Sequence, residues 1–348
     1  MKLLVLNYSM DPRSLVFSHQ REVVKRLSLK FEHTFVVTAD ENTGEKIENV
    51  EIFSSNWIRR KAFKNVIHFY QTVLPVVFPH RKNLIVFSHM TEVQSFLIAP
   101  LCRVLGIPHF LWYAHKSKSK YLKLSLPFLS GVVTSTPGSC PIKSSKVHPI
   151  GQAIDHELFS VTKSFPKNPP LRWYHVGRMD KSKNVDLIIE VFDKLRKAGW
   201  SLQLDFYGEP SSNTAKRYFD ELKLRYLTNN NSSWLTFHGS VERTRIPQVA
   251  SQYDGFVHAF QGSLDKAVLE AAMCKRVVVS INPEFEVEFS STNFTGQTLF
   301  DKLALQLLMA LEMSEEEQRA RIQAFYSIAR EHHSLETWIN ELLEVIRN

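Results

Sequence analysis

The sequence has little cysteine and no long apolar run, and both absences restrict the kind of protein it can be. Its 348 residues include only three cysteines, Cys102, Cys140 and Cys274, which are widely spaced and odd in number. Such a set fits neither a disulfide framework nor a zinc site, so we expect a reducing compartment. No stretch approaches the roughly 18 apolar residues that span a bilayer, and the N-terminal apolar run, Leu3 to Leu6, is too short for a secretion signal. We therefore expect a cytoplasmic protein that at most lies on the inner face of a membrane.

Two common nucleotide-binding patterns are also missing. The chain contains neither the phosphate loop of ATPases nor the GxGxxG fingerprint of dinucleotide-binding domains. It has no low-complexity tract and no short-period repeat. These absences argue against both of those nucleotide-binding classes and against repeat proteins.

What the sequence does contain is a strand and helix alternation that occurs twice. At this length and with 44% hydrophobic residues, the chain fits two domains of roughly 150 to 180 residues each. Short apolar runs typical of buried parallel strands occur at 2–9, 33–40, 83–90, 108–115 and 131–136, and again at 171–177, 202–208, 235–239, 255–260 and 276–280. Helical patterns lie between them, at 18–29, 92–105, 185–198, 215–227 and 246–252. The pattern predicts an α/β fold with two doubly wound Rossmann-like domains that face each other across a cleft.

The domain boundaries follow from composition. The segment Ser160 to Pro170 holds three prolines and no periodicity, which is typical of a linker. We predict an N-terminal domain over 1–160, a linker over 161–170 and a C-terminal domain over 171–325. A final helix over 326–348 is expected to pack back towards the N-terminal domain. Ligands in such folds bind beyond the carboxyl ends of the strands.

Charge is divided unevenly between the two halves. Up to Lys167 the chain has 22 Lys and Arg against 11 Asp and Glu, whereas the remainder has 21 against 24. Two basic segments, 57–71 and 115–129, contribute much of the excess. The first places Ile58, Phe63, Val66, Ile67 and Tyr70 on one helical side, with Arg59, Arg60, Lys61 and Lys64 around it. It fits either an ordinary domain helix with a solvated basic face or a surface for an anionic membrane or substrate. No nucleic-acid-binding motif accompanies the charge, so we expect no nucleic-acid partner.

One strand end combines glycine with cations. Gly177 and Arg178 come directly after a strand, and Lys181 and Lys183 lead into a helix. The glycine allows a ligand to approach, and the cations neutralise negative charge, so the turn suits a diphosphate. The alternative is a solvated turn in which Asp180 pairs with a lysine.

A second strand end leads through a polar loop into a short helix. The loop contains Gly262, Ser263, Leu264, Asp265 and Lys266, and the helix carries the acid Glu270. The first N–H groups of a helix lack intrahelical partners, so this entrance is a candidate anion site. In the alternative reading, Asp265 caps the helix and Lys266 pairs with Glu270 at i,i+4.

These motifs together resemble the GT-B fold, family-4 retaining glycosyltransferases, also called glycosyltransferase group 1. "VGRMDKSKNVDLIIEVF" is similar to the family's Gly-Arg…Lys motif, in which Arg178 and Lys183 would hold the donor's diphosphate. "GSLDKAVLEAAMC" is similar to its acidic motif, in which Glu270 would bind the ribose. "LTFHGSV", ending at Val241, resembles the segment that contacts the base, and "LWYAHKS" places His115 at a donor- or acceptor-side position. The resemblance covers nearly the whole chain, including "IGQAIDHELF" before the linker and the closing helix.

The sequence departs from this family at one position. The family's acidic motif has two glutamates separated by seven residues, but Gly262 stands where the first is expected. We expect Asp265 and Lys266 to substitute for it, because they lie in the same loop and could reach sugar hydroxyls and phosphate. The glycine fits a close approach of a ligand to the backbone. We also expect His89 and Lys116 to lie on the acceptor side.

The resemblance implies transfer of a sugar, with retained anomeric configuration, from a nucleotide-sugar to a saccharide or lipid-linked acceptor in cell-envelope or exopolysaccharide synthesis. Arg178, Lys183 and His115 are the residues implied in catalysis, and neither a metal nor a cofactor is implied. Two alternatives stay open: a sugar-nucleotide epimerase of the same fold, and a binding protein that kept the nucleotide site without transfer.

Overall fold

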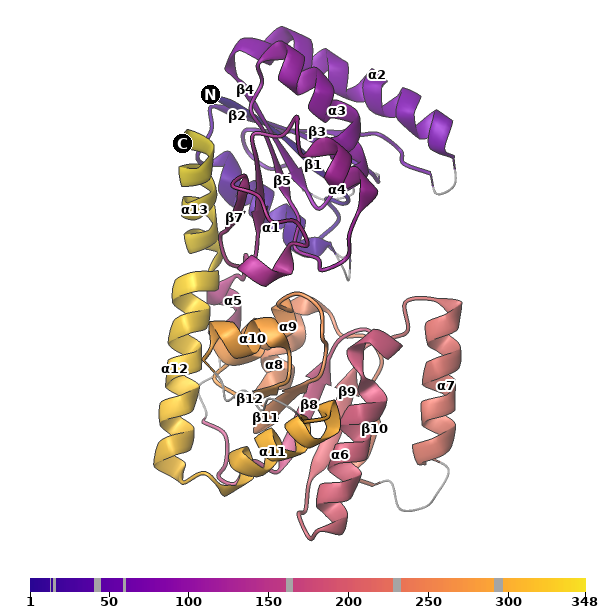
Figure 1. Ribbon diagram of the computed structural model, residues 1–348, viewed down its shortest axis with the longest axis vertical. Helices are drawn as coiled ribbons and strands as arrows, with labels where there is room; N and C mark the ends of the chain where they lie inside the picture. Colours follow the sequence, from indigo (N-terminus) through magenta and orange to yellow (C-terminus); the bar gives the residue numbers. More distant parts are fainter. Residues whose placement is uncertain are drawn as a thin grey trace. The chain divides into compact units, whose positions relative to one another are not determined.

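The chain divides into two compact units (Figure 1). The computed structural model describes residues 1–12, 14, 17–40, 45–58, 61–160, 165–227, 233–290 and 297–348. Unit 1 comprises Met1–Ala153 and Leu335–Asn348, and unit 2 comprises Ile154–Ser334. The chain therefore passes from unit 1 to unit 2 a few residues before the expected linker, because Ile154 is fully buried in unit 2 and its N–H donates to the His333 carbonyl at 3.0 Å. Of the linker, 161–164 lie outside the described residues.

Unit 1 is built on one parallel sheet of seven strands in the order β3-β2-β1-β4-β5-β6-β7. The strands are β1 (Lys2–Asn7), β2 (His33–Thr38), β3 (Val50–Ser54), β4 (Leu84–His89), β5 (His109–Trp112), β6 (Gly131–Thr134) and β7 (Val147–Pro149). The main helices are α1 (Ser18–Ser28), α2 (Ala62–His80), α3 (Glu92–Leu105) and α4 (Lys120–Ser125). The five strands predicted for this half are all present, and the two that the sequence pattern missed, β3 and β7, are short and form the edges of the sheet.

Both faces of the unit 1 sheet are covered, as a doubly wound sheet requires. In β1, Leu3 and Val5 belong to a core that includes α1, whereas Leu4 and Leu6 belong to a second core with α2 and α3. Successive side chains of a strand point to opposite faces, so an uninterrupted apolar run is the expected signature of a strand that is covered on both sides.

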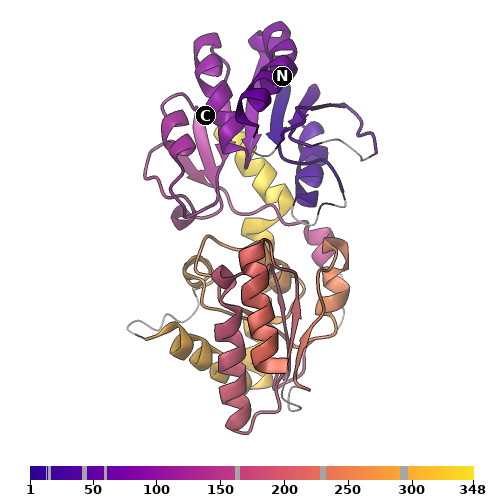
Figure 2. The ribbon, with the colours of Figure 1, turned by 90° about the vertical axis from the view of Figure 1, so that its right-hand side faces the viewer.

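The C-terminal segment completes unit 1. The predicted helix over 326–348 is in fact two helices, α12 (Glu315–His333) in unit 2 and α13 (Leu335–Arg347) in unit 1. Ser334 is extended and ends α12, so the part that packs on unit 1 begins only at Leu335. Trp338 is fully buried, with its ring 5.3 Å from that of Trp112 and 5.9 Å from that of Phe87. Both views show α13, in yellow, beside the unit 1 sheet (Figure 1, Figure 2).

The first basic segment runs into α2, and part of its predicted apolar side is exposed. The helix buries Asn65, Phe69, Val73, Val76 and Val77. Phe63 and Ile67, predicted to lie on one apolar side of the helix, are 81% and 40% exposed. Periodicity identified the apolar stripe, but it does not show which of its residues meet the sheet. Arg59 and Arg60 lie outside the described residues.

Unit 2 contains a parallel sheet of five strands in the order β10-β9-β8-β11-β12. These are β8 (Arg172–Val176), β9 (Gln203–Tyr207), β10 (Leu235–Phe237), β11 (Gly255–His258) and β12 (Val277–Ser280), and each falls on a predicted strand. The helices are α5 (His156–Phe159), α6 (Val185–Lys197), α7 (Asn213–Leu227), α8 (Ile246–Ala250), α9 (Lys266–Met273), α10 (Pro283–Glu288), α11 (Leu299–Glu312) and α12. The two parallel sheets confirm the predicted α/β class. No helix in the described parts of the chain is both long and apolar enough to cross a membrane.

Candidate functional site

The donor-side residues predicted from sequence gather at one edge of the unit 2 sheet. Gly177 and Arg178 follow β8, Val241 lies just beyond β10, and the loop 259–265 follows β11. Because all five strands are parallel, their carboxyl ends meet at the same edge. This is the edge at which open α/β sheets bind their ligands.

Glycines allow the loops to pack closely at this edge. Gly177 N–H donates to the Tyr207 carbonyl at 3.0 Å, and Gly208 N–H donates to the Gly239 carbonyl at 2.6 Å. Gly208 has φ +145°, and a Cβ there would lie 1.8 Å from the Gly177 oxygen. Only glycine fits such a backbone approach. Gly177 was predicted to lie at the site, but Gly208 and Gly239 were not, although each is the last residue of a predicted strand.

Arg178 is held loosely at the edge of the sheet. Its side chain is 56% exposed, and Nη1 lies 3.4 Å from Oδ2 of Asp180. Asp180 also accepts hydrogen bonds from the N–H of Ser211 at 3.1 Å and from its hydroxyl at 2.7 Å. Asp180 thus pairs with an arginine rather than with the lysine considered from the sequence. The guanidinium is exposed enough for an anionic ligand to bind it.

Lys183 is buried, in contrast to Arg178. It ends the single turn Lys181–Lys183, and its ammonium forms an ion pair with Asp265. The ammonium also lies 4.0 Å from the centre of the Phe260 ring. Asn184, in the left-handed conformation at φ 52°, donates to the Ala259 carbonyl at 2.8 Å. The turn after β8 is therefore fastened to the loop after β11.

Asp265 caps α9 and also carries the charge that meets Lys183. Its carboxylate accepts a hydrogen bond from the Ala267 N–H at 3.4 Å, as one sequence reading predicted. Burial raises the pKa of this carboxyl, but the Lys183 ammonium and the hydrogen bond from His258 outweigh that effect and hold the pKa well below its ordinary value. Capping and ion pairing therefore coexist in one side chain.

The loop before α9 is fixed by an amide that the sequence analysis missed. Asn282 donates to the carbonyls of Phe260 at 2.8 Å, Gly262 at 3.2 Å and Ser263 at 3.2 Å. A Cβ at Gly262 would lie 2.0 Å from Cζ of Phe260, so the phenyl ring occupies the space that a larger residue at this position would need. The absence of an acid at position 262 is thus coupled to the placement of Phe260.

Glu270 has a partner that the sequence did not indicate. It is 5% exposed, and its Oε1 accepts a hydrogen bond from Nε of Arg243 at 2.9 Å. From the sequence, Lys266 was the expected partner in one of the two interpretations. Burial, together with the neighbouring charge of Arg243, lowers the pKa of Lys266 to about 7. Arg243 could have been suspected only because it follows the predicted base-contacting segment.

The remaining donor-side residues serve different purposes. Leu264 is 1% exposed and belongs to the hydrophobic core beneath α9, against which Val241 also packs. Ser263 is buried beside it. His238, within the predicted base-contacting segment, stacks on Tyr207 with ring centres 4.5 Å apart and an interplanar angle of 8°. A flat aromatic surface therefore lies near the ends of β9 and β10.

In unit 1 the predicted acceptor-side residues have contrasting environments. His115 and Lys116 are exposed in the loop after β5, and the His115 ring lies edge-on to Tyr113 at 5.6 Å. His89 ends β4 and is 2% exposed, with its ring 6.1 Å from Trp338 and 6.5 Å from Trp112. His89 is therefore part of the aromatic packing that holds α13 in place.

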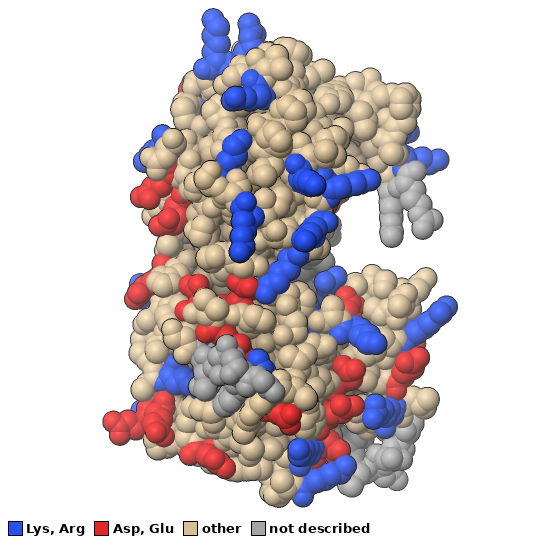
Figure 3. Space-filling model, in the orientation of Figure 1, with Lys and Arg blue, Asp and Glu red and all other residues tan. Residues whose placement is uncertain are grey.

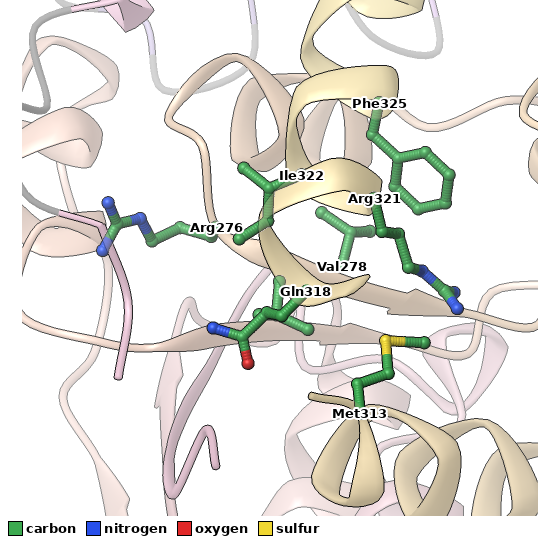
Figure 4. Close-up of a pocket in the computed structure, with 8 residues that line it drawn as sticks. Arg276, Val278, Met313, Gln318, Arg321, Ile322 and Phe325 are labelled. Carbon is green, nitrogen blue, oxygen red and sulfur yellow. The ribbon is translucent and has the colours of Figure 1, made fainter. Parts of the chain in front are cut away.

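Unit 2 also has a small cavity beneath α12 (Figure 4). Its volume is about 10 Å³, and it is lined by Arg276, Val277, Val278, Met313, Gln318, Arg321, Ile322 and Phe325. Figure 4 shows the guanidinium groups of Arg276 and Arg321 pointing away from each other. The cavity has room for about one water molecule, so it is a packing feature and not a substrate site.

Comparison with known proteins agrees with this geometry. Residues 161–325 match the model of the family described as Glycosyl transferases group 1. No curated protein matches the sequence significantly. Among solved structures, HepE of Anabaena in complex with UDP-glucose is 15% identical with a TM-score of 0.72, and the match covers 100% of this chain and 99% of that one. Sucrose-phosphate synthase of Thermosynechococcus elongatus is 14% identical with a TM-score of 0.76, covering 100% and 98%.

A further structure, the E. coli trehalose-6-phosphate protein bound with UDP-2-fluoro glucose, is 12% identical with a TM-score of 0.77, covering 100% and 99%. The predicted resemblance and the predicted enzyme class are both confirmed. The chain has two Rossmann-like domains in the GT-B fold, and its residues 161–325 match the glycosyl transferases group 1 family.

Proposed function

We propose that this protein is a retaining glycosyltransferase that moves a sugar from a nucleotide-sugar to a saccharide or lipid-linked acceptor in cell-envelope or exopolysaccharide synthesis. One observation carries the donor half of the proposal. Arg178, Lys183 and the N-terminus of α9 belong to loops at the same carboxyl edge of the unit 2 sheet, and Lys183 and Asp265 are in direct contact. Two cations beside a helix N-terminus suit a diphosphate.

The chemistry follows from where negative charge develops. As the bond between the sugar and the diphosphate breaks, charge accumulates on the leaving phosphate oxygens. Arg178 can donate two parallel hydrogen bonds to them, and the Lys183 ammonium can donate from a position that is already fixed. Preorganised donors of this kind stabilise the transition state without a reorganisation step. Charge stabilisation of this type needs neither a metal nor a cofactor, and we propose that the protein uses none.

The rest of the donor has matching surfaces in unit 2. Glu270, held by Arg243, presents a carboxylate that can accept hydrogen bonds from ribose hydroxyls. The base would lie near Val241, where the stacked pair of Tyr207 and His238 offers a flat aromatic surface. HepE, a protein of similar fold, has been solved with UDP, with UDP and glucose, and with UDP-glucose, which supports a UDP-sugar as the first donor to test.

We assign the acceptor side to unit 1. His115 and Lys116 are exposed after β5, so an acceptor hydroxyl or an anionic group can reach them from solvent. His89 is buried among aromatic rings, and its contribution is to hold the strand end in position. Between Ile52 and Ile154 the sequence contains a single acid, Glu92, against thirteen lysines and arginines, so this unit would attract an anionic acceptor.

The outer face of α2 supports contact with an anionic membrane. Phe63, Ile67 and Phe78 are 81%, 40% and 44% exposed along the helix, which contains no acid. Lys61 and Lys64 lie at its start, and Arg81 and Lys82 follow its end. Lysine and arginine side chains stand out on the drawn face of unit 1 (Figure 3). An apolar stripe between basic ends fits the boundary between lipid headgroups and acyl chains, so we propose a cytoplasmic protein that lies on the inner membrane surface.

Calorimetric titration with UDP-, GDP- and ADP-linked sugars tests the donor site, with wild type and Arg178→Ala side by side. Arg178 is half exposed, so its removal should leave the fold intact. We expect the wild type to bind sugars linked to one of these three nucleotides. Turnover in the variant should fall roughly a hundredfold, since one charged hydrogen-bond donor contributes about 3 kcal/mol to stabilising the transition state. Wild-type turnover in Arg178→Ala would disprove the assignment.

Product analysis separates the alternatives. A retaining transferase yields a new glycoside with the anomeric configuration of the donor. Conversion of the donor sugar without any acceptor product would identify an epimerase, and tight binding without turnover would identify a binding protein.

Flotation with vesicles tests the membrane contact separately. Binding to vesicles that contain anionic lipid should weaken with salt and weaken further in Phe63→Ser/Ile67→Ser. Failure to bind such vesicles at low salt would exclude the membrane contact and leave the donor site unaffected.

A further inference from the structure

A chain of buried polar groups reaches Lys183 from the interior of unit 2. Ser280 lies at the end of β12, and its hydroxyl is 3.0 Å from Nδ1 of His258 at the end of β11. Nε2 of His258 is 3.3 Å from Oδ2 of Asp265, and the same oxygen accepts a hydrogen bond from Lys183. His258 and Ser280 are both fully buried. Four side chains from four segments therefore form one continuous network.

The direction of each hydrogen bond in this network can be assigned. Asp265 is ionised and can only accept, so Nε2 of His258 must carry a proton. Nδ1 then accepts from the Ser280 hydroxyl, whose oxygen in turn accepts from the Asn282 N–H at 3.2 Å. Burial lowers the pKa of His258 despite its hydrogen bond to Asp265, so the ring stays neutral near pH 7. A neutral, doubly bonded imidazole fixes the orientation of the carboxylate.

The Lys183 ammonium has more donors than this network uses. It carries three N–H groups, of which one is directed at Asp265, while the face of Phe260 covers another side at 4.0 Å. Breaking a buried ion pair is strongly unfavourable, so a ligand would meet Lys183 with Asp265 still attached. The remaining N–H can then point at a phosphate oxygen.

We propose that Asp265, oriented by His258, is a positioning carboxylate that holds the Lys183 ammonium in place for the donor's diphosphate. Asp265 lies in direct contact with Lys183. Gly262 stands where an acid was expected, and the Phe260 ring fills the space beside it. The inference rests on the proposed function, since it assumes a nucleotide-sugar donor. It adds two residues, His258 and Ser280, that stabilise the site from within the sheet.

Two substitutions test the proposal. Asp265→Asn keeps an oxygen that can cap α9 but removes the charge, and His258→Phe keeps a ring of similar size but removes both hydrogen bonds. With the nucleotide-sugar that the wild type binds, we expect kcat to fall about tenfold or more in Asp265→Asn and by a smaller factor in His258→Phe, because a misplaced catalytic group loses rate. The Kd should change by less than about threefold, because ground-state binding to Arg178 remains.

Asp155→Asn is the matched control. Asp155 caps α5 in the same unit by accepting from the Leu158 N–H at 3.2 Å, so this variant reports what a weakened cap does by itself. An equal fall in kcat in the control would overturn the proposal. Unchanged kcat in Asp265→Asn would overturn it too. Tighter donor binding with faster turnover would show that Asp265 competes with phosphate instead of positioning Lys183.

A measurement without any donor distinguishes failure of this inference from failure of the proposed function. In protein labelled with nitrogen-15 at lysine, a buried and ion-paired ammonium should give a resolved signal, whereas exposed ammonium groups exchange rapidly with water. The signal that disappears in Lys183→Arg should also disappear or broaden in Asp265→Asn and His258→Phe. If it persists unchanged in both, the network does not hold Lys183, whatever the wild type binds.

Discussion

Arg243 and Glu270 form an ion pair at the base of the candidate donor site. Nε of Arg243 donates to Oε1 of Glu270 at 2.9 Å, and Nη2 lies 2.9 Å from the same oxygen. The guanidinium also lies 5.3 Å from the centre of the Phe159 ring. The two side chains are 18% and 7% exposed, so neither charge is well solvated. The pair fixes the carboxylate that is proposed to meet the ribose.

Arg243→Ala should therefore be strongly destabilising. It leaves the buried carboxylate of Glu270 without its cation, and removal of one partner of a buried pair costs about 3 to 5 kcal/mol. We expect a clearly lower unfolding midpoint in urea and weaker donor binding. The double variant Arg243→Met/Glu270→Met should recover much of the stability but not the binding. Arg319→Ala, which removes an exposed i,i+4 pair with Glu315, is the control, and an equal loss there would contradict the prediction.

Gly262→Ala should displace Phe260. The new Cβ would lie 2.0 Å from Cζ of the ring, so the ring must move from its place beside the Lys183 ammonium. Overpacking of this kind typically costs about 1 to 3 kcal/mol. In Phe260→Ala the same glycine substitution should have little effect on melting temperature, and this coupling is measured by a double-mutant cycle. Additive effects in the cycle would show that the two residues do not compete for the same space.

Donor binding should take up a proton near neutral pH. The pKa of Lys266 is lowered to about 7 by burial and by Arg243, so its ammonium is only partly protonated there. A diphosphate at the start of α9 would favour the charged form and raise the pKa. Calorimetry in two buffers of different ionisation enthalpy should reveal this uptake, and it should vanish in Lys266→Met. Binding enthalpies that do not depend on the buffer would refute it.

Stability of unit 1 should fall as the solution becomes acidic. Burial lowers the pKa of His109 to about 3, and its Nε2 lies 2.8 Å from the Ser88 hydroxyl. In the unfolded chain His109 binds a proton at about pH 6.5, whereas in the folded chain it does so only near pH 3. Its contribution to stability is therefore fully present above pH 6.5 and is lost progressively as the pH falls from 6.5 to 3. The slope for one histidine is about 1.4 kcal/mol per pH unit. Urea midpoints between pH 7 and pH 5 should fall less steeply in His109→Gln, and identical slopes would contradict the prediction.

Much of the fold could be predicted because the relevant signals are local. A parallel strand covered on both faces needs an uninterrupted apolar run, as in β1 and β4, and each such run was identified. The edge strands β3 and β7 were missed because they are only partly buried, with polar residues such as Glu51 and His148 among them. The apolar stripe of α2 was identified, but its orientation was not, since periodicity does not say which side faces the sheet.

The candidate site, like the fold, could be predicted only in part from the sequence. The sequence by itself determined which loops carry cations, glycine and acid, because Arg178, Lys183 and Glu270 stand at recognisable spacings beside predicted strands and helices. Only the tertiary structure decided their partners. Lys183 meets Asp265 across 82 positions and Glu270 meets Arg243 across 27, and such pairings depend on the order of strands in the sheet, which no local pattern encodes. His258 and Asn282 acquire their functions for the same reason: burial at the ends of neighbouring strands brings together polar groups that the chain itself keeps far apart.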